Sequence, residues 1–360
     1  MTRTGKMNSR FTGVNNESVE IFLATAMEGI AHDIAQMAQP SLVAVLLGGG
    51  YGRGEGGVYF TSNGVPRPYN DLDFFVFLRN ASTKTRKQIN SNLQVIGEKW
   101  TNILGVDVDF GNPKDVSKLH KLSGTLMFQE LKQCHKCIFG NANVLKDFPQ
   151  LPAESLPIME GLRLMMNRGM GILLAGERIS KKSADHAFIL RNLNKAVLGA
   201  GDALLINNGK YQWKLMERRK EFARFIQENP LNAFMEKDYN TACNFKLSPN
   251  GIWPDNPFEA WSHVRDIWCE TLVTLMASGS PEPNEIRAAL HKACLEHNGR
   301  SWLNPLKYLV RTHSITMSLD SPFIGILGDI YDILFHSQSA TTEQYPEIPS
   351  QLQHAWLSFN

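Results

Sequence analysis

The feature that most constrains the fold is the segment LLGGGYGRGEGG, residues 46–57, in which seven of the twelve residues are glycine. It continues the apolar run LVAVLL, residues 42–47, which is typical of a buried strand. Glycines after a strand let the backbone turn sharply and let another group approach it closely. The segment therefore predicts a strand that ends in a ligand-binding turn, and the surrounding residues must indicate the class of ligand.

Three familiar glycine motifs fit this segment poorly. A dinucleotide-binding G-x-G-x-x-G would end at Gly57 and open a helix, but the following VYFTSNGVPRP contains an Asn-Gly pair and two prolines. A P-loop needs Lys and then Ser or Thr after its last glycine, whereas Gly54 is followed by Glu55. Residues 109–111 spell the D-F-G of protein kinases, but no H-R-D precedes them and no V-A-I-K follows the glycines.

Two pairs of carboxylates follow the glycine segment. Asp71 and Asp73 belong to the strand-like DLDFFVFL, and Asp107 and Asp109 to the strand-like GVDVDF. Residues i and i+2 of a strand point to the same side, so each pair places like charges next to each other. A divalent cation neutralises such a pair, and Mg²⁺ (or Mn²⁺) prefers carboxylates together with substrate phosphates. The pattern therefore indicates phosphoryl chemistry at a metal site.

The pattern of elements predicts an α+β protein with two domains. Residues 16–39 and 82–103 have helical spacing and alternate with the strand-like segments, which indicates an α/β domain with a small mixed sheet over residues 1–150. The remainder, residues 151–360, is expected to be all-helical, without convincing strands. The helices predicted in this part cover 157–178, 184–206, 212–228, 256–278, 283–297, 302–316 and 322–336.

Composition narrows the partners and the location. The chain has 37 Lys and Arg against 35 Asp and Glu, which disfavours a long nucleic acid as partner. The N-terminal residues have no apolar core of a secretory signal, and no uncharged apolar run is long enough to span a membrane. The five cysteines are irregularly spaced and do not indicate a disulfide framework. We therefore expect a cytoplasmic protein with no membrane association.

The strand, glycine turn and acidic strands together resemble the nucleotidyltransferase superfamily that includes DNA polymerase β. The string GGYGRGE, residues 49–55, is similar to the loop of the uridylyltransferases that modify nitrogen-signalling proteins, and PYNDLDFFVF is similar to their acidic strand. GTLMFQELKQCHKCIFGN, residues 124–141, is similar to the end of the catalytic domain in small antibiotic-modifying and antitoxin-type members. The resemblance covers roughly residues 40 to 145.

The resemblance implies specific roles for these residues. Gly49 and Gly50 would bind the triphosphate of an NTP such as ATP, with Tyr51 and Arg53 in the same nucleotide-binding loop. The metal ligands would be Asp71, Asp73 and the third acid, Asp107, with Asp109 as the alternate third acid; all four are candidate catalytic residues. The resemblance further implies that a lysine of the helical half contacts the triphosphate, and Lys195 is the candidate, with Lys210 and Tyr211 as neighbours to consider.

Several of these roles have structural alternatives. Arg53 could form an internal ion pair with Glu55 instead of binding phosphate. Lys195 could be a solvated lysine, and Tyr211 a residue at the edge of the core. Gly50 and Asp71 are separated by more residues than the resemblance leads us to expect, so residues 56–67 are interpreted as an inserted loop or hairpin over the site.

The expected function is metal-dependent transfer of a nucleoside monophosphate from an NTP to an acceptor hydroxyl, with release of pyrophosphate. The acceptor is expected to be a small molecule or a protein. Two alternatives stay open: a catalytically idle nucleotide-binding or antitoxin-like partner protein, and a template-independent RNA nucleotidyltransferase.

Overall fold

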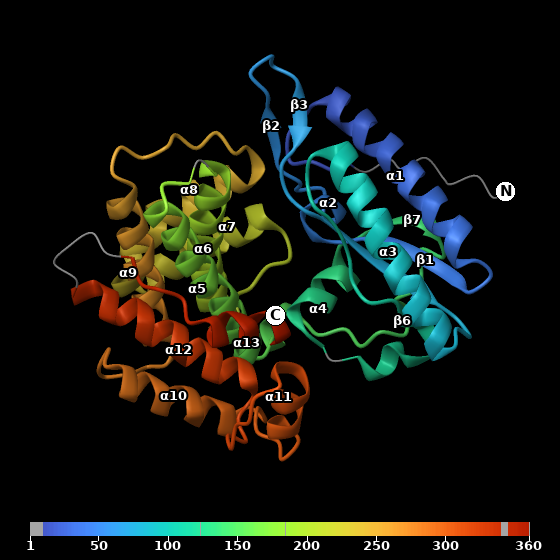
Figure 1. Ribbon diagram of the computed structural model, residues 1–360. Coiled ribbons are helices and arrows are strands. Elements are labelled where there is room, and N and C mark those ends of the chain that lie inside the picture. The colour runs from blue at the N-terminus through green and yellow to red at the C-terminus, as the bar shows by residue number, and fades with distance from the viewer. Residues whose placement is uncertain (1–9, 123, 184, 340–344, 360) are drawn as a thin grey trace. The chain divides into compact units, whose positions relative to one another are not determined.

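The computed structural model describes residues 10–122, 124–183, 185–339 and 345–359 and divides them into two compact units (Figure 1). The first unit consists of the described residues up to Leu151, together with Trp213–Leu215 and Asn244–Asn250. The second unit consists of Pro152–Gln212, Met216–Cys243 and the described residues from Gly251 onward. Two short segments of the C-terminal half of the chain thus complete the first unit.

A five-stranded mixed sheet forms the centre of the first unit. Its strands are β1 (Leu42–Leu47), β4 (Leu72–Leu78), β5 (Val108–Phe110), β6 (Lys114–Asp115) and β7 (Lys136–Gly140). The order is β5-β4-β1-β7, and β6 also pairs with β4. The strands β4 and β7 run antiparallel to β1, whereas β5 and β6 run parallel to β4. The glycine segment and the acidic segments therefore belong to neighbouring strands of one sheet.

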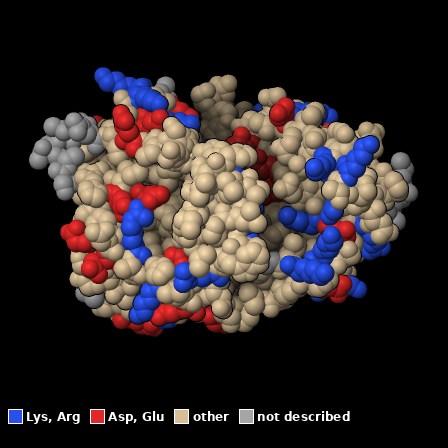
Figure 2. Space-filling model, turned by 60° about the horizontal axis from the view of Figure 1, so that its bottom comes forward, with Lys and Arg blue, Asp and Glu red and all other residues tan. Residues whose placement is uncertain are grey.

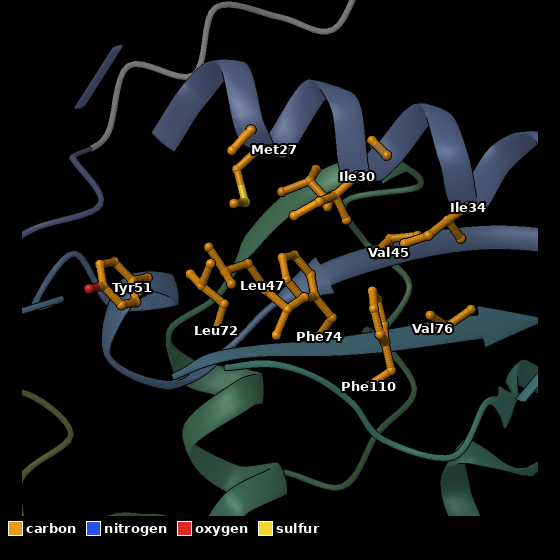
Figure 3. Close-up of a cluster of buried hydrophobic side chains, with 14 of the residues drawn as sticks. Met27, Ile30, Ile34, Val45, Leu47, Tyr51, Leu72, Phe74, Val76 and Phe110 are labelled. Atoms are coloured by element: carbon orange, nitrogen blue, oxygen red, sulfur yellow. The ribbon is translucent and has the colours of Figure 1, made fainter. Parts of the chain in front are cut away.

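Two long helices, α1 (Glu17–Ala38) and α3 (Thr83–Leu104), contribute to the core on one face of this sheet. Their N-termini are capped by Asn16 and Ser82, whose side chains accept backbone N–H groups of the first turn. Figure 3 shows the α1 side chains of this core above side chains of β1, β4 and β5. The labelled members are Met27, Ile30, Ile34, Val45, Leu47, Tyr51, Leu72, Phe74, Val76 and Phe110.

A smaller core lies on the opposite face. Phe75 and Phe77 of β4 pack there with Phe128 of α4 (Leu126–Gln133) and with Phe148 of the loop after β7. The short 3-10 segment η1 (Val116–Lys121) also contributes to it. Because β4 alternates between the two cores, Asp71 and Asp73 fall on the same side as Phe75 and Phe77.

Helices make up the regular structure described in the second unit. Helix α5 (Ile158–Ser180) packs against α6 (His186–Asn207) and α9 (Pro257–Leu275). The buried indole N–H groups of Trp261 and Trp268 on α9 donate to the α5 carbonyls of Ile172 (2.8 Å) and Met165 (3.0 Å). The α-helices of the C-terminal half are α5 (Ile158–Ser180), α6 (His186–Asn207), α7 (Leu215–Glu228), α8 (Glu236–Leu247), α9 (Pro257–Leu275), α10 (Pro283–Glu296), α11 (Asn304–Thr312), α12 (Pro322–His336) and α13 (Ser350–Phe359). Short 3-10 segments are η2 (Ala153–Ser155), η3 (Pro230–Met235) and η4 (Ser337–Ser339).

The expected fold class, α+β with a small mixed N-terminal sheet and a helical C-terminal part, is confirmed. The helices α8 and α13 were not predicted, and the residues on which the signal-peptide argument depends begin outside the described part of the chain. Among the described residues, no helix is both long and apolar enough to cross a membrane.

Candidate active site

The glycine segment forms a tight turn against the acidic strand. The short helix α2 (Gly49–Gly52) follows β1, and the Gly48 N–H donates to the Asp73 carbonyl at 2.8 Å. Gly49 has φ +57°, and a Cβ placed on it would lie 2.0 Å from Oδ2 of Asp73. Only glycine satisfies both the left-handed backbone and this close approach. The turn therefore brings the Asp73 carboxylate into contact with the backbone of Gly49.

The acids of the two parallel strands lie on the same side of the sheet. In the β4–β5 pairing Asp73 is opposite Asp109, and the preceding pair is Leu72 and Val108. Leu72 and Val108 belong to the core beneath α1 and α3, so the alternating aspartates point to the opposite side. Asp73 is half-buried and Asp109 is exposed. In the strand order, Asp73 of β4 thus lies between Asp109 of β5 and the strand β1 that leads into the glycine turn.

The first acid of each pair lies just before its strand. Asp71 lies just before β4 and is half-buried, whereas Asp107 lies just before β5 and is exposed. The Asp107 carbonyl accepts the N–H of Leu72 at 2.8 Å. This bond holds the first residues of β4 and β5 next to each other. The register makes Asp109 the direct neighbour of Asp73, although the sequence favoured Asp107 as the third acid.

The donor set of this face fits a hard divalent cation in its chemistry, because it consists of carboxylate oxygens. Among the described residues, however, no group of three or more His, Cys, Asp or Glu side chains is close enough to hold a metal ion. Mg²⁺ is commonly bound through one or two carboxylates together with substrate phosphates and waters. A metal site here would therefore take part of its ligands from the substrate.

Tyr51, expected among the nucleotide-binding residues, is fully buried in the core of the first unit. Its hydroxyl donates to the Gly57 carbonyl (2.7 Å) and accepts the N–H of Tyr69 (2.9 Å) and of Asn70 (3.3 Å). Burial raises the pKa of this phenol well above its ordinary value, so the proton needed for the bond to Gly57 is retained. The side chain joins the two ends of the residue 56–67 insertion, and only the backbone of Tyr51 remains for a ligand.

Arg53 forms an internal ion pair with Glu55, which was the expected alternative to phosphate binding. Its Nε lies 3.3 Å from Oε2 of Glu55, and its Nη1 lies 2.9 Å from Oε2 of Glu130 on α4. Oε1 of Glu55 accepts the N–H of Leu215 at 2.8 Å, in a segment of the C-terminal half that belongs to the first unit. Glu130 was not predicted as a partner, because it lies 77 positions from Arg53 in the sequence.

The insertion after the glycine turn forms a hairpin, one of its two expected forms. Strands β2 (Val58–Phe60) and β3 (Pro66–Pro68) pair antiparallel, with a turn in which Gly64 has φ +72°. Arg67 of β3 stands over the Phe22 ring of α1 at 5.1 Å. The hairpin is thereby attached to the N-terminal helix.

The residues considered in the helical half lie in the second unit. Lys195 lies on α6 and is half-buried. Tyr211 is buried and its hydroxyl accepts a hydrogen bond from Arg218, which agrees with a core role for this tyrosine. The triphosphate contact of Lys195 stays a prediction.

Comparisons with known proteins give little further information. No protein-family model matches the sequence, and no curated protein matches it. Among solved structures, the chain is similar to a spectinomycin adenyltransferase from Enterococcus faecialis, crystallised with ATP and spectinomycin. The sequence identity is 13%, the TM-score is 0.40, and the match covers 69% of this chain and 98% of the adenyltransferase.

Proposed function

We propose that the protein is a metal-dependent nucleotidyltransferase. In the proposed reaction an acceptor hydroxyl attacks the α-phosphorus of an NTP, a new P–O bond forms, and the bond to the leaving pyrophosphate breaks. The observation that carries the proposal is the pairing of Asp73 with Asp109 on parallel strands beside the Gly49 turn. This arrangement combines backbone that can approach phosphates with carboxylates that can hold their counterions.

Each residue of the site has a distinct proposed role. The backbone of Gly49 and Gly50 binds the triphosphate, while Asp71 and Asp73 hold Mg²⁺ or Mn²⁺. Asp109, opposite Asp73, is our preferred third acid and helps to remove the proton of the acceptor hydroxyl, with Asp107 as its alternate. The bound ions would neutralise the negative charge on the attacking and leaving oxygens.

The proposal extends to the substrates. We propose a small molecule or a protein as acceptor, because the near balance of 37 basic and 35 acidic residues offers little attraction for a long phosphate backbone. Lys195 is proposed to contact the triphosphate as a point charge. Arg53 has no part in this proposal, because its guanidinium already bridges Glu55 and Glu130.

The first test measures binding and chemistry with the same set of variants. Mn²⁺ binding is followed by electron paramagnetic resonance with each of the four NTPs, and transfer is followed with α-labelled NTPs and panels of hydroxylated small molecules, proteins and short RNAs. Asp73→Asn is expected to weaken Mn²⁺ binding, and Asp109→Asn to lower transfer at least about 100-fold. Asp107→Asn has the smaller effect if Asp109 is the third acid.

Asp147→Asn is the matched control, because Asp147 is an exposed aspartate of the same unit outside the acidic strands. NTP and Mn²⁺ binding without transfer to any acceptor would indicate an idle nucleotide-binding protein. Labelled RNA products would indicate an RNA nucleotidyltransferase. If Asp73→Asn and Asp147→Asn bind Mn²⁺ and NTP equally well, the proposed site is wrong.

A further inference from the structure

The phenol of Tyr51 connects the glycine turn to the backbone that leads into the first acid. Tyr51 belongs to α2, two positions after Gly49, and its ring is part of the core of the first unit. Its hydroxyl accepts the N–H of Tyr69 at 2.9 Å and, in a longer bond of 3.3 Å, the N–H of Asn70. Asn70 immediately precedes Asp71, a proposed metal ligand. One side chain of the turn is therefore bonded to the residue before this acid.

A second bond holds Asn70 against the same segment. Its side-chain oxygen accepts the N–H of Gly57 at 2.8 Å, and the Tyr51 hydroxyl donates to the carbonyl of Gly57 at 2.7 Å. A Cβ on Gly57 would lie 2.5 Å from Oδ1 of Asn70 and 2.6 Å from the carbonyl oxygen of Lys246, so this position has no room for a side chain. Tyr51, Gly57 and Asn70, which we call the Tyr51 cluster, therefore form one closely packed hydrogen-bonded group.

Asp71 lies between two residues whose backbone is held in place. Asn70 before it belongs to the Tyr51 cluster, and Leu72 after it is fully buried and donates its N–H to the Asp107 carbonyl at 2.8 Å. Burial is the main cause that raises the pKa of the Tyr51 phenol, and the charge of Asp71 raises it as well, which indicates that this carboxylate acts on the cluster electrostatically. The cluster thus limits where the Asp71 carboxylate can lie relative to the glycine turn.

We propose that Tyr51 is a positioning residue of the acidic site. Its hydroxyl fixes Asn70 and, through it, the Asp71 carboxylate relative to the Gly49 turn. This role rests on the proposed function, because it concerns how Asp71 meets a metal ion bound to an NTP. The Tyr51 side chain is fully buried, so it would act only through Asp71. Removing a group that orients a metal ligand typically weakens metal binding about 10- to 100-fold.

Tyr51→Phe is the substitution that removes the hydroxyl alone. The ring has to be kept, because a Cβ on Gly56 would lie 2.0 Å from its Cδ1, so the ring packs directly on the backbone there. Figure 2 shows basic and acidic side chains on the displayed face of the molecule, and such charges act on an ionic ligand from a distance. Tyr51→Phe changes none of these charges, because the phenol is neutral. A change in Mn²⁺ binding therefore reports the geometry of the site.

The test measures the dissociation constant of Mn²⁺ from the full chain by electron paramagnetic resonance, with Mn²⁺ alone and with each of the four NTPs. Tyr51→Phe is expected to raise this constant at least about 10-fold at a temperature where the variant is folded. Tyr331→Phe is the matched control, because the buried Tyr331 of the second unit donates its hydroxyl to the Pro281 carbonyl at 2.6 Å. This control loses a comparable hydrogen bond and should bind Mn²⁺ as the wild-type protein does.

A double substitution shows whether Tyr51 acts through Asp71. In Asp71→Asn protein, adding Tyr51→Phe should change the constant less than about 2-fold, since the carboxylate that it positions is already absent. Full additivity of the two effects would place the action of Tyr51 elsewhere and overturn the proposal. The amide exchange of Tyr69 and Asn70 should also become faster in Tyr51→Phe, because both N–H groups lose this acceptor. Unchanged exchange would contradict the proposal as well.

Failure of this role is distinguishable from failure of the proposed function. If the wild-type protein binds Mn²⁺ with an NTP and Tyr51→Phe binds it equally well, the positioning role is wrong and the proposed site stands. The same holds if Tyr331→Phe loses as much Mn²⁺ affinity as Tyr51→Phe, since the loss would then follow from stability alone. If the wild-type protein binds neither Mn²⁺ nor NTP, the proposed function fails, and the role of Tyr51 with it.

Discussion

At the scale of single residues, Gly49 is the position of the proposed site where a side chain fits worst. Its left-handed φ disfavours any other residue, and the space a Cβ needs is taken by Oδ2 of Asp73. These two penalties can be separated, because Gly64 in the hairpin turn has φ +72° and no atom within 4 Å of the place that a Cβ would take. Gly64 is thus a matched reference for the backbone penalty alone.

Gly49→Ala is therefore expected to lower the stability of the protein more than Gly64→Ala. Gly64→Ala should lower the free energy of unfolding by about 1 kcal/mol, from its backbone conformation. Gly49→Ala should lower it further and, by displacing the Asp73 carboxylate, weaken Mn²⁺ binding. Chemical denaturation and Mn²⁺ titration of the two variants test this. Equal effects in both assays would show that the contact with Asp73 has no consequence.

The placement of single residues was partly predictable from the sequence. The acidic pairs were found because alternation along a strand is a local property, and their common side follows from it. The burial of Tyr51 and the bridge from Arg53 to Glu130 were not predicted. Glu130 lies 77 positions from Arg53, and the hydroxyl of Tyr51 bonds to residues 6, 18 and 19 positions away. None of these contacts leaves a periodic pattern in the sequence.

At the scale of elements, a polar contact joins the two long helices of the first unit, α1 and α3. Asp33 of α1 accepts hydrogen bonds from Lys99 Nζ (2.6 Å) and Trp100 Nε1 (2.9 Å) of α3. Partial burial alone would raise the pKa of this carboxyl, but the bonds from Lys99 and Trp100 outweigh it, and the net pKa is lowered. The contact therefore stabilises the folded protein in the ionised form of Asp33.

The stabilisation by Asp33 should depend on pH in a defined direction. Because the folded pKa is lowered, the contribution is complete above the ordinary carboxyl pKa of about 3.9 and is lost as the pH falls through the folded value. Asp33→Asn should thus lower the melting temperature at neutral pH but not near pH 2. Melting curves of both proteins across this range are the measurement. A difference in melting temperature that stays constant with pH would contradict it.

The long elements could be predicted, and of the short ones only β5, within GVDVDF, was expected as a strand of its own. The helices α1 and α3 and the strands β1 and β4 agree with the expected segments to within about two residues, since periodicity over many positions is distinctive. The two- and three-residue strands β2, β3 and β6 contain too few positions to show alternation. Their pairing is set by neighbouring strands instead.

At the scale of the whole molecule, the first unit depends on residues far along the chain. Besides the bond from Leu215 to Glu55, the Phe245 ring contacts the Tyr69 ring edge-on at 5.8 Å. Leu247 fills the space beside Gly13, where a Cβ would meet its Cδ2 at 2.7 Å. These contacts could not be read from local patterns, so the sequence predicted residues 1–150 as a separate domain without them.

A fragment of residues 1–151 is expected to be less stable than the same residues in the full chain. It lacks the two returning segments and so exposes the surfaces around Glu55, Tyr69 and Gly13. Amide exchange over β1 and β4 should be faster in the fragment. The control is a fragment extended to residue 250, which restores both segments and should recover part of the protection. Equal protection in all three proteins would contradict the expectation.

The two returning segments, Trp213–Leu215 and Asn244–Asn250, also determine whether the products of proteolysis separate. Along the sequence, the backbone passes between the units after Leu151, Gln212, Leu215, Cys243 and Asn250. A single cut after Leu151 would leave Trp213–Leu215 and Asn244–Asn250 embedded in the N-terminal piece, and the two products would stay associated until denatured. Limited digestion followed by a native separation would therefore report one species where a denaturing gel shows two.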